Sequence, residues 1–471
     1  MTDPPPEHLT PGQDLPQGRL GRSLPLAGLT LRTAGAAASA AWHAQPDAVA
    51  VVHSRATQRY AELLGRSRGA LMKAGQLLSL VALAPAVPAA HRAVYQEALT
   101  RLQDDAPPMP ASLASAVVEA ELHRPLGQIF AGFGPRPIAA ASIGQVHAAR
   151  LPDGRAAAVK IQYPGVARAI RADLRNSQLL ATFLQLGRGL TSVRVDVNAI
   201  TREVAARIEE ELDYRTEAAH QAEFAAAYRG HPFIRIPEII PELSTRRVLT
   251  MELAGGKRWP QALTASQALR DRWGEVIYRF AVGSLCRLRM VNADPQPGNY
   301  LFHDDGAVTF LDFGCVKHYT SEQITALQSA AQATVDGDAQ ALCRVLAAAG
   351  YVDQADAPDP RQLLRWLEEA LTPIVAPQPF TFTPELAAAL ARTGLSRSGR
   401  HAEVICRLTV PAELVSIARV NLGLTAVLGA LHATGEWDVI RREHDRCGPA
   451  ATPLGRQDLG FWHARRPQAP R

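Results

Sequence analysis

The chain has 471 residues, of which 47% are hydrophobic and 20% are charged. This is long enough for two or three domains or one bilobal unit, and too apolar for a globally disordered protein. Fifty Lys and Arg residues against 45 Asp and Glu residues give a net charge of +5, and no basic run is interleaved with aromatic residues. The composition therefore argues against nucleic-acid binding, although it suits contact with an anionic membrane surface.

The cysteines and the termini indicate the compartment. Five scattered cysteines include no Cys-x-x-Cys pair, which argues against a zinc site or a disulfide framework and favours a reducing cytosol. Residues 1–24 read as a disordered tail that is too polar for a signal peptide, and residues 445–471 read as a second, flexible tail. We expect a cytoplasmic protein, with peripheral contact at the inner face of a membrane and a homodimer both left open.

In chain order, the first expected unit is an Ala- and Leu-rich helical extension at 25–130, containing a helix that ends at the paired prolines 107–108. A β-rich lobe follows at 131–253. Its signals are strands at 138–146 and 156–162 around a Pro-Asp-Gly turn, a long helical stretch at 196–228, and short strands at 234–240 and 247–253.

The last expected unit, 254–444, is mostly helical and is interrupted by a hairpin at 300–312. Its segment 422–433 is apolar but too short to cross a bilayer. That segment is either a core helix or a surface that docks on a membrane. The order of units predicts an α+β, bilobal protein-kinase-like fold, with a small β-rich N-lobe, a large helical C-lobe and an N-terminal helical extension.

Three motifs have the spacing of phosphoryl-transfer machinery. Asp294 is followed five residues later by Asn299, and Asp312-Phe313-Gly314 begins 13 residues after Asn299, beyond the predicted hairpin. Protein kinases place a base or orienting Asp, a metal-binding Asn and a metal-binding Asp in this register. We therefore expect Asp294 to be catalytic, and Asn299 and Asp312 to hold Mg²⁺.

Lys160 is the one charged residue in the apolar strand at 156–162. A buried lysine must pair with an acid, so Lys160 either contacts phosphate beside such a partner or lies exposed on an edge strand. Glu217, on the following helix, is the expected partner, with Glu211 and Asp213 on neighbouring turns.

The expected phosphate loop departs from the kinase pattern G-x-G-x-x-G-x-V. In that frame the chain has Ala139, Ala141, Gly144 and Val146, so that two glycines are replaced by alanines. Each Cβ restricts the backbone, and phosphate should be held differently from the usual geometry. Ala140 lies in the same loop, and Ser142 offers a hydroxyl instead.

Together these motifs closely resemble the UbiB (AarF-like) family of atypical protein-kinase-like proteins. The resemblance covers about residues 60–330 and rests on these segments in the family's order: Lys73-Ala74-Gly75-Gln76, Gln103-Asp104-Asp105, Ser142–His147, Val159–Gly165, Glu211–Tyr214 with Glu217, Asn292–Asn299 and Leu311–Gly314. It implies bound ATP and Mg²⁺, slow hydrolysis, and a link to isoprenoid quinone or membrane-lipid metabolism. A nucleotide and an isoprenoid lipid or quinone precursor are the implied partners.

The resemblance also implies roles that the residues alone do not. The family's K-x-G-Q helix lies across the protein-substrate site, which would make Lys73, Gly75 and Gln76 regulatory, and Glu211 and Asp213 would contact that helix. Glu252 falls where a kinase hinge meets adenine, although it is also explained as a plain strand end. The chain departs from the family at Gln296 and Asn292, where many members have histidine.

Two functional classes are compatible with these motifs. The first is an ATP- and Mg²⁺-dependent ATPase or phosphotransferase in lipid or quinone metabolism. The second is a nucleotide-gated scaffold with little turnover. A genuine protein kinase or a small-molecule kinase of the same fold is a further alternative, although the K-x-G-Q segment separates this chain from the small-molecule enzymes.

Overall fold

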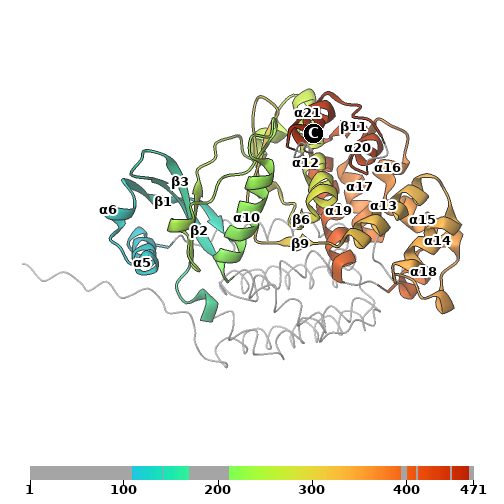
Figure 1. The fold of residues 1–471 in the computed structure, drawn as a ribbon, viewed down its shortest axis with the longest axis horizontal. Helices are drawn as coiled ribbons and strands as arrows, with labels where there is room; N and C mark the ends of the chain where they lie inside the picture. The colour runs from blue at the N-terminus through green and yellow to red at the C-terminus, as the bar shows by residue number, and fades with distance from the viewer. Residues whose placement is uncertain are drawn as a thin grey trace, which may run out of the picture.

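The computed structural model describes residues 109–141, 143–168, 212–393, 400–409, 412–445 and 448–465. The proposed regulatory residues Lys73, Gly75, Gln76 and Glu211, as well as Ser142, lie outside the described residues. The two-lobed α+β arrangement predicted from the sequence is confirmed (Figure 1). No helix in the described residues is both long and apolar enough to cross a membrane.

The smaller lobe is built on one antiparallel sheet with strand order β1-β2-β3-β5. Its elements, with the short strand β4 that pairs with the large lobe, are α5 (Ala111–Leu122), α6 (Leu126–Ile129), β1 (Gly132–Ala141), β2 (Gly144–Arg150), β3 (Ala156–Gln162), α10 (Tyr214–Tyr228), β4 (Ile234–Arg235), η1 (Pro241–Leu243) and β5 (Val248–Glu252).

The larger lobe is mainly helical, as expected. Its elements are α11 (Trp259–Leu263), α12 (Gln267–Gly283), η2 (Ser284–Leu288), β6 (Met290–Asn292), η3 (Pro297–Asn299), β7 (Tyr300–Phe302), β8 (Val308–Phe310), β9 (Val316–His318), α13 (Ser321–Val335), α14 (Ala339–Ala348), η4 (Gln354–Asp356), α15 (Pro360–Ala370), α16 (Thr372–Val375), β10 (Phe380–Thr381), α17 (Pro384–Thr393), α18 (Ala402–Arg407), α19 (Ala412–Leu431), β11 (Thr434–Gly435), α20 (Trp437–His444) and α21 (Pro453–Ala464).

Strand β3 is buried on both faces because each face has a helix against it. Side chains alternate along a strand, so Val159 and Ile161 pack in the same cluster as Val118 of α5, whereas Ala158 packs on the opposite side. Helix α5 therefore completes the core of the small lobe. The last part of the extension predicted at 25–130, from Met109 onward, packs on this sheet, and the boundary at residues 130 and 131 stays a prediction.

The long helix predicted at 196–228 does not run unbroken through its C-terminal half. Asp213 has extended backbone angles, and its carboxylate accepts a hydrogen bond from the backbone N–H of Arg215. This is the geometry of a helix N-cap, so α10 starts at Tyr214. The cap matters for function because it places Glu217 in the first turn of α10.

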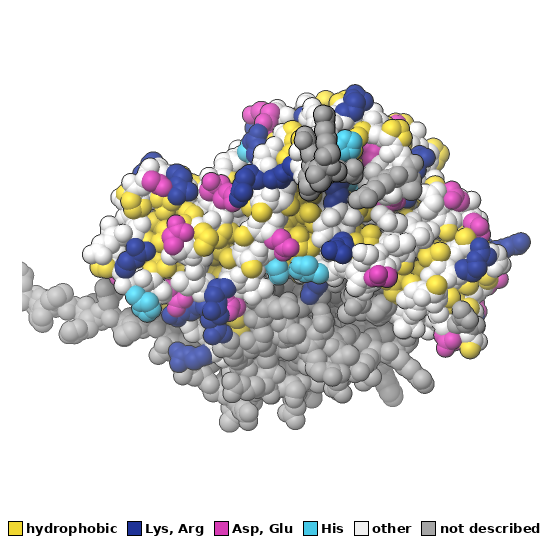
Figure 2. Space-filling model, in the orientation of Figure 1, with side chains coloured by type: hydrophobic (Ala, Val, Ile, Leu, Met, Phe, Trp, Pro, Cys, Tyr) yellow, Lys and Arg dark blue, Asp and Glu magenta, His cyan; other side chains and the backbone are white. Residues whose placement is uncertain are grey.

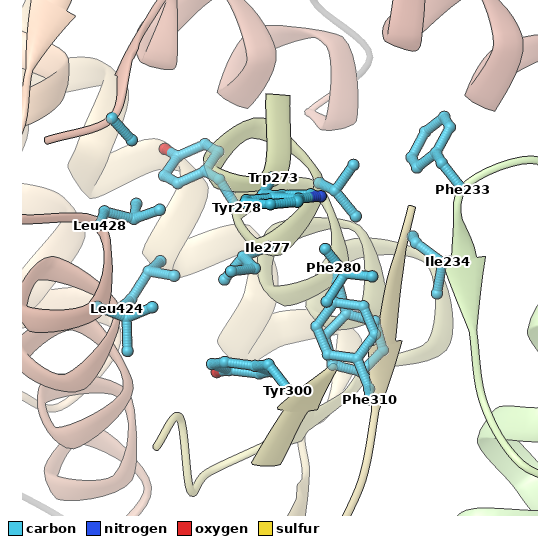
Figure 3. Close-up of a cluster of buried hydrophobic side chains, with 14 of the residues drawn as sticks. Phe233, Ile234, Trp273, Ile277, Tyr278, Phe280, Tyr300, Phe310, Leu424 and Leu428 are labelled. Carbon is cyan, nitrogen blue, oxygen red and sulfur yellow. The ribbon is translucent and has the colours of Figure 1, made fainter. Parts of the chain in front are cut away.

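The core of the large lobe joins α12, α19 and the β7–β8 hairpin (Figure 3). Phe280 stacks on Phe310 with 3.8 Å between ring centroids. Leu424 and Leu428 of α19 point into the same cluster, and both are at most 6% exposed. Of the two explanations for the apolar segment 422–433, the core helix is therefore correct, and the segment is not a free docking surface.

The tail predicted at 445–471 contains a docked helix instead. The Thr452 hydroxyl caps α21 by accepting a hydrogen bond from Gly455, and Leu454 is buried in the large-lobe core. Figure 1 shows α21 beside α12, at the C-terminal end of the coloured chain. The prediction of a tail relied on average composition. Polar, Pro and Gly residues dominate this segment, and only a few side chains between them anchor the helix.

Asp458 is the buried anchor of α21. Its Oδ1 lies 3.0 Å from Nε2 of His231, and its Oδ2 accepts a 2.7 Å hydrogen bond from Arg287. Burial alone would raise the pKa of Asp458, but His231 and Arg287 outweigh this and hold the pKa below its usual range. Burial lowers the pKa of His231, whose Nδ1 accepts from the backbone of Ile234, so a neutral ring donates from Nε2 to the ionised Asp458.

We predict that Asp458→Ala destabilises the protein by roughly 3–5 kcal/mol, because it leaves the buried His231 and the half-buried Arg287 without their acceptor. Thermal or urea unfolding measures this effect. The control is Asp304→Ala, which removes an exposed ion pair with Lys257 and should cost about 0–1 kcal/mol. Equal losses in the two variants would contradict the anchoring role of Asp458.

Candidate functional site

The predicted site residues come from both lobes and meet between them. Lys160 lies near the middle of β3 and Glu217 in the first turn of α10. Asp294 follows β6, Asn299 ends the 3-10 turn η3, and Asp312 follows β8. Asp294 and Asp312 each lie just beyond a short strand whose apolar side chains are buried in a core, and Asn299 directly precedes the buried Tyr300 of β7, so these neighbours fix the place of all three residues.

Lys160 forms the ion pair with Glu217 that the sequence predicted. Its Nζ lies 2.8 and 2.9 Å from the two carboxylate oxygens of Glu217, and 3.2 Å from Oδ2 of Asp312. The side chains of Lys160 and Glu217 are only 10% and 7% exposed, whereas that of Asp312 is 41% exposed. The cluster therefore has a closed side at Glu217 and an open side at Asp312.

The charge of Lys160 is held by these two acids. Burial would lower the pKa of Lys160, but Asp312 and Glu217 outweigh that effect and raise the pKa well above its usual value. The ring of Tyr214 adds a cation–π contact, with its centroid 5.1 Å from Nζ. Lys160 is thus a permanent cation, and it joins β3, α10 and the Asp312 segment at one point.

Asp213 directly precedes α10, and its carboxylate bonds to Arg215. Its carboxylate accepts hydrogen bonds from the guanidinium of Arg215 at 2.9 and 2.6 Å, and these bonds lower the pKa of Asp213. Its proposed contact with the Lys73–Gln76 segment lies outside the described residues and stays a prediction.

Asp312 adopts an uncommon backbone conformation with φ of 59°. For a residue other than glycine, this left-handed region costs about 1–3 kcal/mol and persists only where neighbours hold it. Here Asn292 donates to the Asp312 carbonyl at 2.9 Å, and the Gly314 N–H donates to Oδ1 at 3.2 Å. The neighbouring Phe313 is fully buried and packs on Phe224 of α10, so the segment is clamped on both sides.

Asn292 has a role that we did not assign from the sequence. Besides holding Asp312, its Oδ1 accepts the backbone N–H of Asp294 at 3.1 Å. One amide therefore connects the two acidic segments of the site. Its position, two residues before Asp294, is the signal that marks it in the sequence.

Asn299 is oriented by the loop that contains Asp294. Its Nδ2 donates to the backbone carbonyl of Asp294 at 3.1 Å, which leaves Oδ1 as the end of the amide that can accept a cation. The carboxylate of Asp294 itself accepts from Gln296 at 3.2 Å and from Arg419 at 2.7 Å. Arg419 belongs to α19 and is a second residue that sequence reasoning missed.

The alanine-rich loop is a continuation of the β1–β2 ladder. Ala139 pairs with Val146, Ala140 with Gln145, and Ala141 with Gly144. A Cβ added at Gly144 would lie 2.1 Å from the carbonyl oxygen of Ile161. Close strand packing therefore explains this glycine without any phosphate. The assignment of the loop to nucleotide binding remains a prediction.

Glu252 is the last residue of β5, where it pairs with Ala157 and accepts the backbone N–H of Glu238 at 3.2 Å. Its side chain is exposed, while the preceding Met251 is buried. The structure thus shows a strand end beside the link between the lobes. Contact with adenine at this position stays a prediction.

The profile of the ABC1 atypical kinase-like domain matches residues 101–346, just over half of the chain, including every described site residue named above except Arg419. The chain belongs to this family. The resemblance found from the motifs is therefore confirmed, together with the kinase-like fold.

Curated proteins of the ABC1 family align with about half of the chain. The chain is 36% identical over 257 residues to the uncharacterised protein sll0005 of Synechocystis, with 53% of this chain and 37% of that protein covered. It is 36% identical over 283 residues to the atypical kinase COQ8B of Rattus norvegicus, with 60% and 52% covered. It is 32% identical over 268 residues to the mitochondrial atypical kinase COQ8 of Saccharomyces cerevisiae, with 56% and 52% covered. The chain thus spans about half or less of these relatives' length.

One solved structure is similar along nearly its whole length. This is Rv3197 of Mycobacterium tuberculosis in complex with erythromycin, at 29% sequence identity and a TM-score of 0.62. The match covers 86% of this chain and 99% of that one. The common architecture therefore extends beyond the region that the family profile matches.

We predict that Lys160→Met destabilises the protein by roughly 3–5 kcal/mol, because Glu217 is left as a buried charge without its partner. Thermal unfolding measures the loss. The double variant Lys160→Met, Glu217→Leu should recover most of it, since the unpaired buried charge is removed. The control Lys257→Met breaks an exposed pair and should cost about 0–1 kcal/mol. Failure of the double variant to recover stability would contradict this account.

Proposed function

We propose that this protein binds ATP with Mg²⁺ and hydrolyses it slowly, in support of isoprenoid quinone or membrane-lipid metabolism. The observation that carries the proposal is the Lys160–Glu217–Asp312 cluster, which Asn292 joins to the loop containing Asp294 and Asn299. One permanent cation and an exposed carboxylate converge where the two lobes meet. Phosphoryl transfer needs this combination, because its catalysis is mostly positioning and neutralisation of charge.

The donor set fits a bound Mg²⁺ ion. Asp312 has an exposed carboxylate, and Asn299 presents its amide oxygen because its nitrogen is already bonded to Asp294. Carboxylate and amide oxygens are ligands that Mg²⁺ accepts beside phosphate oxygens. When bound, the ion would neutralise charge on the β- and γ-phosphates.

The chain's own residues supply the remaining roles. Lys160 would hold the α- and β-phosphates, and Glu217 keeps that lysine in place. Asp294 would orient or deprotonate the attacking group, either water or a hydroxyl. The alanine Cβ atoms at 139 and 141 restrict the loop that covers phosphates in kinases, so phosphate would be held differently from the usual kinase geometry.

The metabolic assignment rests on the family and not on the site's geometry. Several relatives are named atypical kinase COQ8 or COQ8B and are mitochondrial, and others from Arabidopsis thaliana are chloroplastic. A link to isoprenoid quinones or membrane lipids is the family's association. Figure 2 shows Lys and Arg interspersed with Asp and Glu on the visible described surface. This visible face therefore offers no extended single-sign patch to lipid headgroups.

We predict Mg²⁺-dependent release of phosphate from ATP by the purified protein, and loss of that activity in Asp312→Asn. The loss should be at least the ~10–100-fold that removal of an outer-shell partner typically costs at a metal site. The control Asp304→Asn changes an exposed acid in the β7–β8 turn and should leave the rate unchanged. Phosphate release that is equal in Asp312→Asn and the wild type, or that survives chelation of Mg²⁺, would contradict the proposed activity.

Two alternatives have their own signatures in the same assay. A nucleotide-gated scaffold would co-purify with ATP and release no phosphate above the Asp312→Asn level. A protein kinase would instead transfer labelled phosphate from ATP to proteins of a native lysate, and Asp312→Asn would abolish that transfer.

We predict that vesicles containing anionic lipid raise the rate of ATP hydrolysis, whereas vesicles of neutral phosphatidylcholine do not. The measurement is initial phosphate release at matched lipid concentrations. Erythromycin forms a separate arm, because the similar protein Rv3197 was solved with that macrolide. Stimulation by erythromycin alone would replace the lipid assignment with a macrolide-like ligand. No effect of anionic vesicles would contradict the metabolic part of the proposal.

A further inference from the structure

Arg419 is bonded to the residue that we place at the centre of the chemistry. Its Nη2 donates to Oδ1 of Asp294 at 2.7 Å, and the two side chains are 16% and 22% exposed. The partners are 125 residues apart in the sequence. A half-buried, charge-assisted hydrogen bond of this length is stronger than a neutral one and fixes the orientation of the carboxylate.

The position of Arg419 is set by how α19 packs. The next residue, Val420, is buried in a cluster with Val291 and Ala293, which lead into Asp294. One helical turn after Arg419, a Cβ added at Gly423 would lie 2.5 Å from Cγ of Pro295. Residues four apart lie on the same face of a helix. Helix α19 is therefore seated directly on the loop that contains Asp294.

The loop itself provides no cation for Asp294. Residues 294–299 read Asp-Pro-Gln-Pro-Gly-Asn, and among the described residues the only other donor to Oδ1 is the neutral amide of Gln296, at 3.2 Å. On the second oxygen, Oδ2, the donor within the described part of the chain is Nδ2 of Asn299, at 3.5 Å. Within that part of the chain, the strong bonds converge on Oδ1 and Oδ2 has the weaker partner.

We propose that Arg419 is a positioning residue for Asp294. It holds Oδ1 so that Oδ2 faces the attacking water or hydroxyl. It also supplies the positive charge beside Asp294 that residues 294–299 do not provide. The inference rests on the proposed ATP-hydrolysing function and adds to it a residue from outside the matched family domain, which ends at residue 346. Because Arg419 acts through Asp294, its contribution depends on the Asp294 carboxylate.

The test is a double-mutant cycle on steady-state ATP hydrolysis, with wild type, Arg419→Gln, Asp294→Asn and the double variant. We expect Arg419→Gln to lower kcat by ~10–100-fold while KM for ATP stays within about twofold, because the change affects the attacking group and not nucleotide binding. In the Asp294→Asn background, Arg419→Gln should have no further effect on kcat. Arg419→Lys, which keeps the charge, should recover part of the rate.

The matched control is Arg407→Gln, an arginine of α18 that pairs with Asp356 and Glu403 away from the site, and it should leave kcat unchanged. Thermal unfolding and ADP binding establish that Arg419→Gln is folded, and Arg419→Lys replaces it if it is not. An unchanged or raised kcat in an otherwise active protein, or losses that multiply in the double variant, would overturn the role of Arg419 alone. A wild-type protein without any hydrolysis would overturn the proposed function and this inference together.

Discussion

The ion pair between Lys160 and Glu217 is the constraint on which the site depends. It joins a strand residue and a helix residue that are 57 positions apart in the sequence. Both side chains are buried, where neither charge would be stable without the other. Asp312, the third member, brings the large lobe to the same point. Because the site consists of residues from both lobes, its geometry is a property of how the lobes meet. The buried side of the cluster fixes this arrangement, and the exposed carboxylate of Asp312 is available for a ligand.

Ion pairs also join the helices of the large lobe. Arg279 of α12 is 1% exposed and bonds to Glu275, to Glu443 of α20 and to Thr452 at the start of α21. A Cβ added at Gly455 would come within 2.7 Å of this guanidinium, so the glycine permits the approach of α21. Buried pairs of this kind add little net stability but are costly to break. They select one arrangement of helices over others, which a site shared between lobes requires.

The parts of the site that are close in sequence could be predicted, and the parts that are brought together by packing could not. Asp294, Asn299 and Asp312 lie within 19 residues, so their spacing alone indicates the chemistry. The pairing of Lys160 was predictable because a lone charge in an apolar strand needs a partner. Nothing near Arg419 marks it in this way, because its helix also contains the polar residues Glu413, Ser416, Asn421 and Thr425 and its partner lies in a distant loop.

The sequence of helix α21 contains a helical pattern, but the composition around it favours a tail. Leu454, Asp458 and Trp462 recur every four residues, which is the spacing of one helical face, but the surrounding composition favoured a tail. The break before α10 was likewise signalled by Asp213, a good N-cap residue. In both cases single anchoring side chains decided the structure, and averages over a segment conceal such residues.

Helix α10 is fixed by contacts at both of its ends. Glu217 in its first turn is tied to Lys160, and the carbonyls of Ala226 and Ala227 in its last turn accept hydrogen bonds from Arg465, next to α21. Fifteen residues of helix span roughly 22 Å. A small tilt of α10 about one end would therefore displace the residues at its other end. The position of the Lys160–Glu217 pair therefore depends on how both ends of α10 are seated, including the end that contacts the residue after α21.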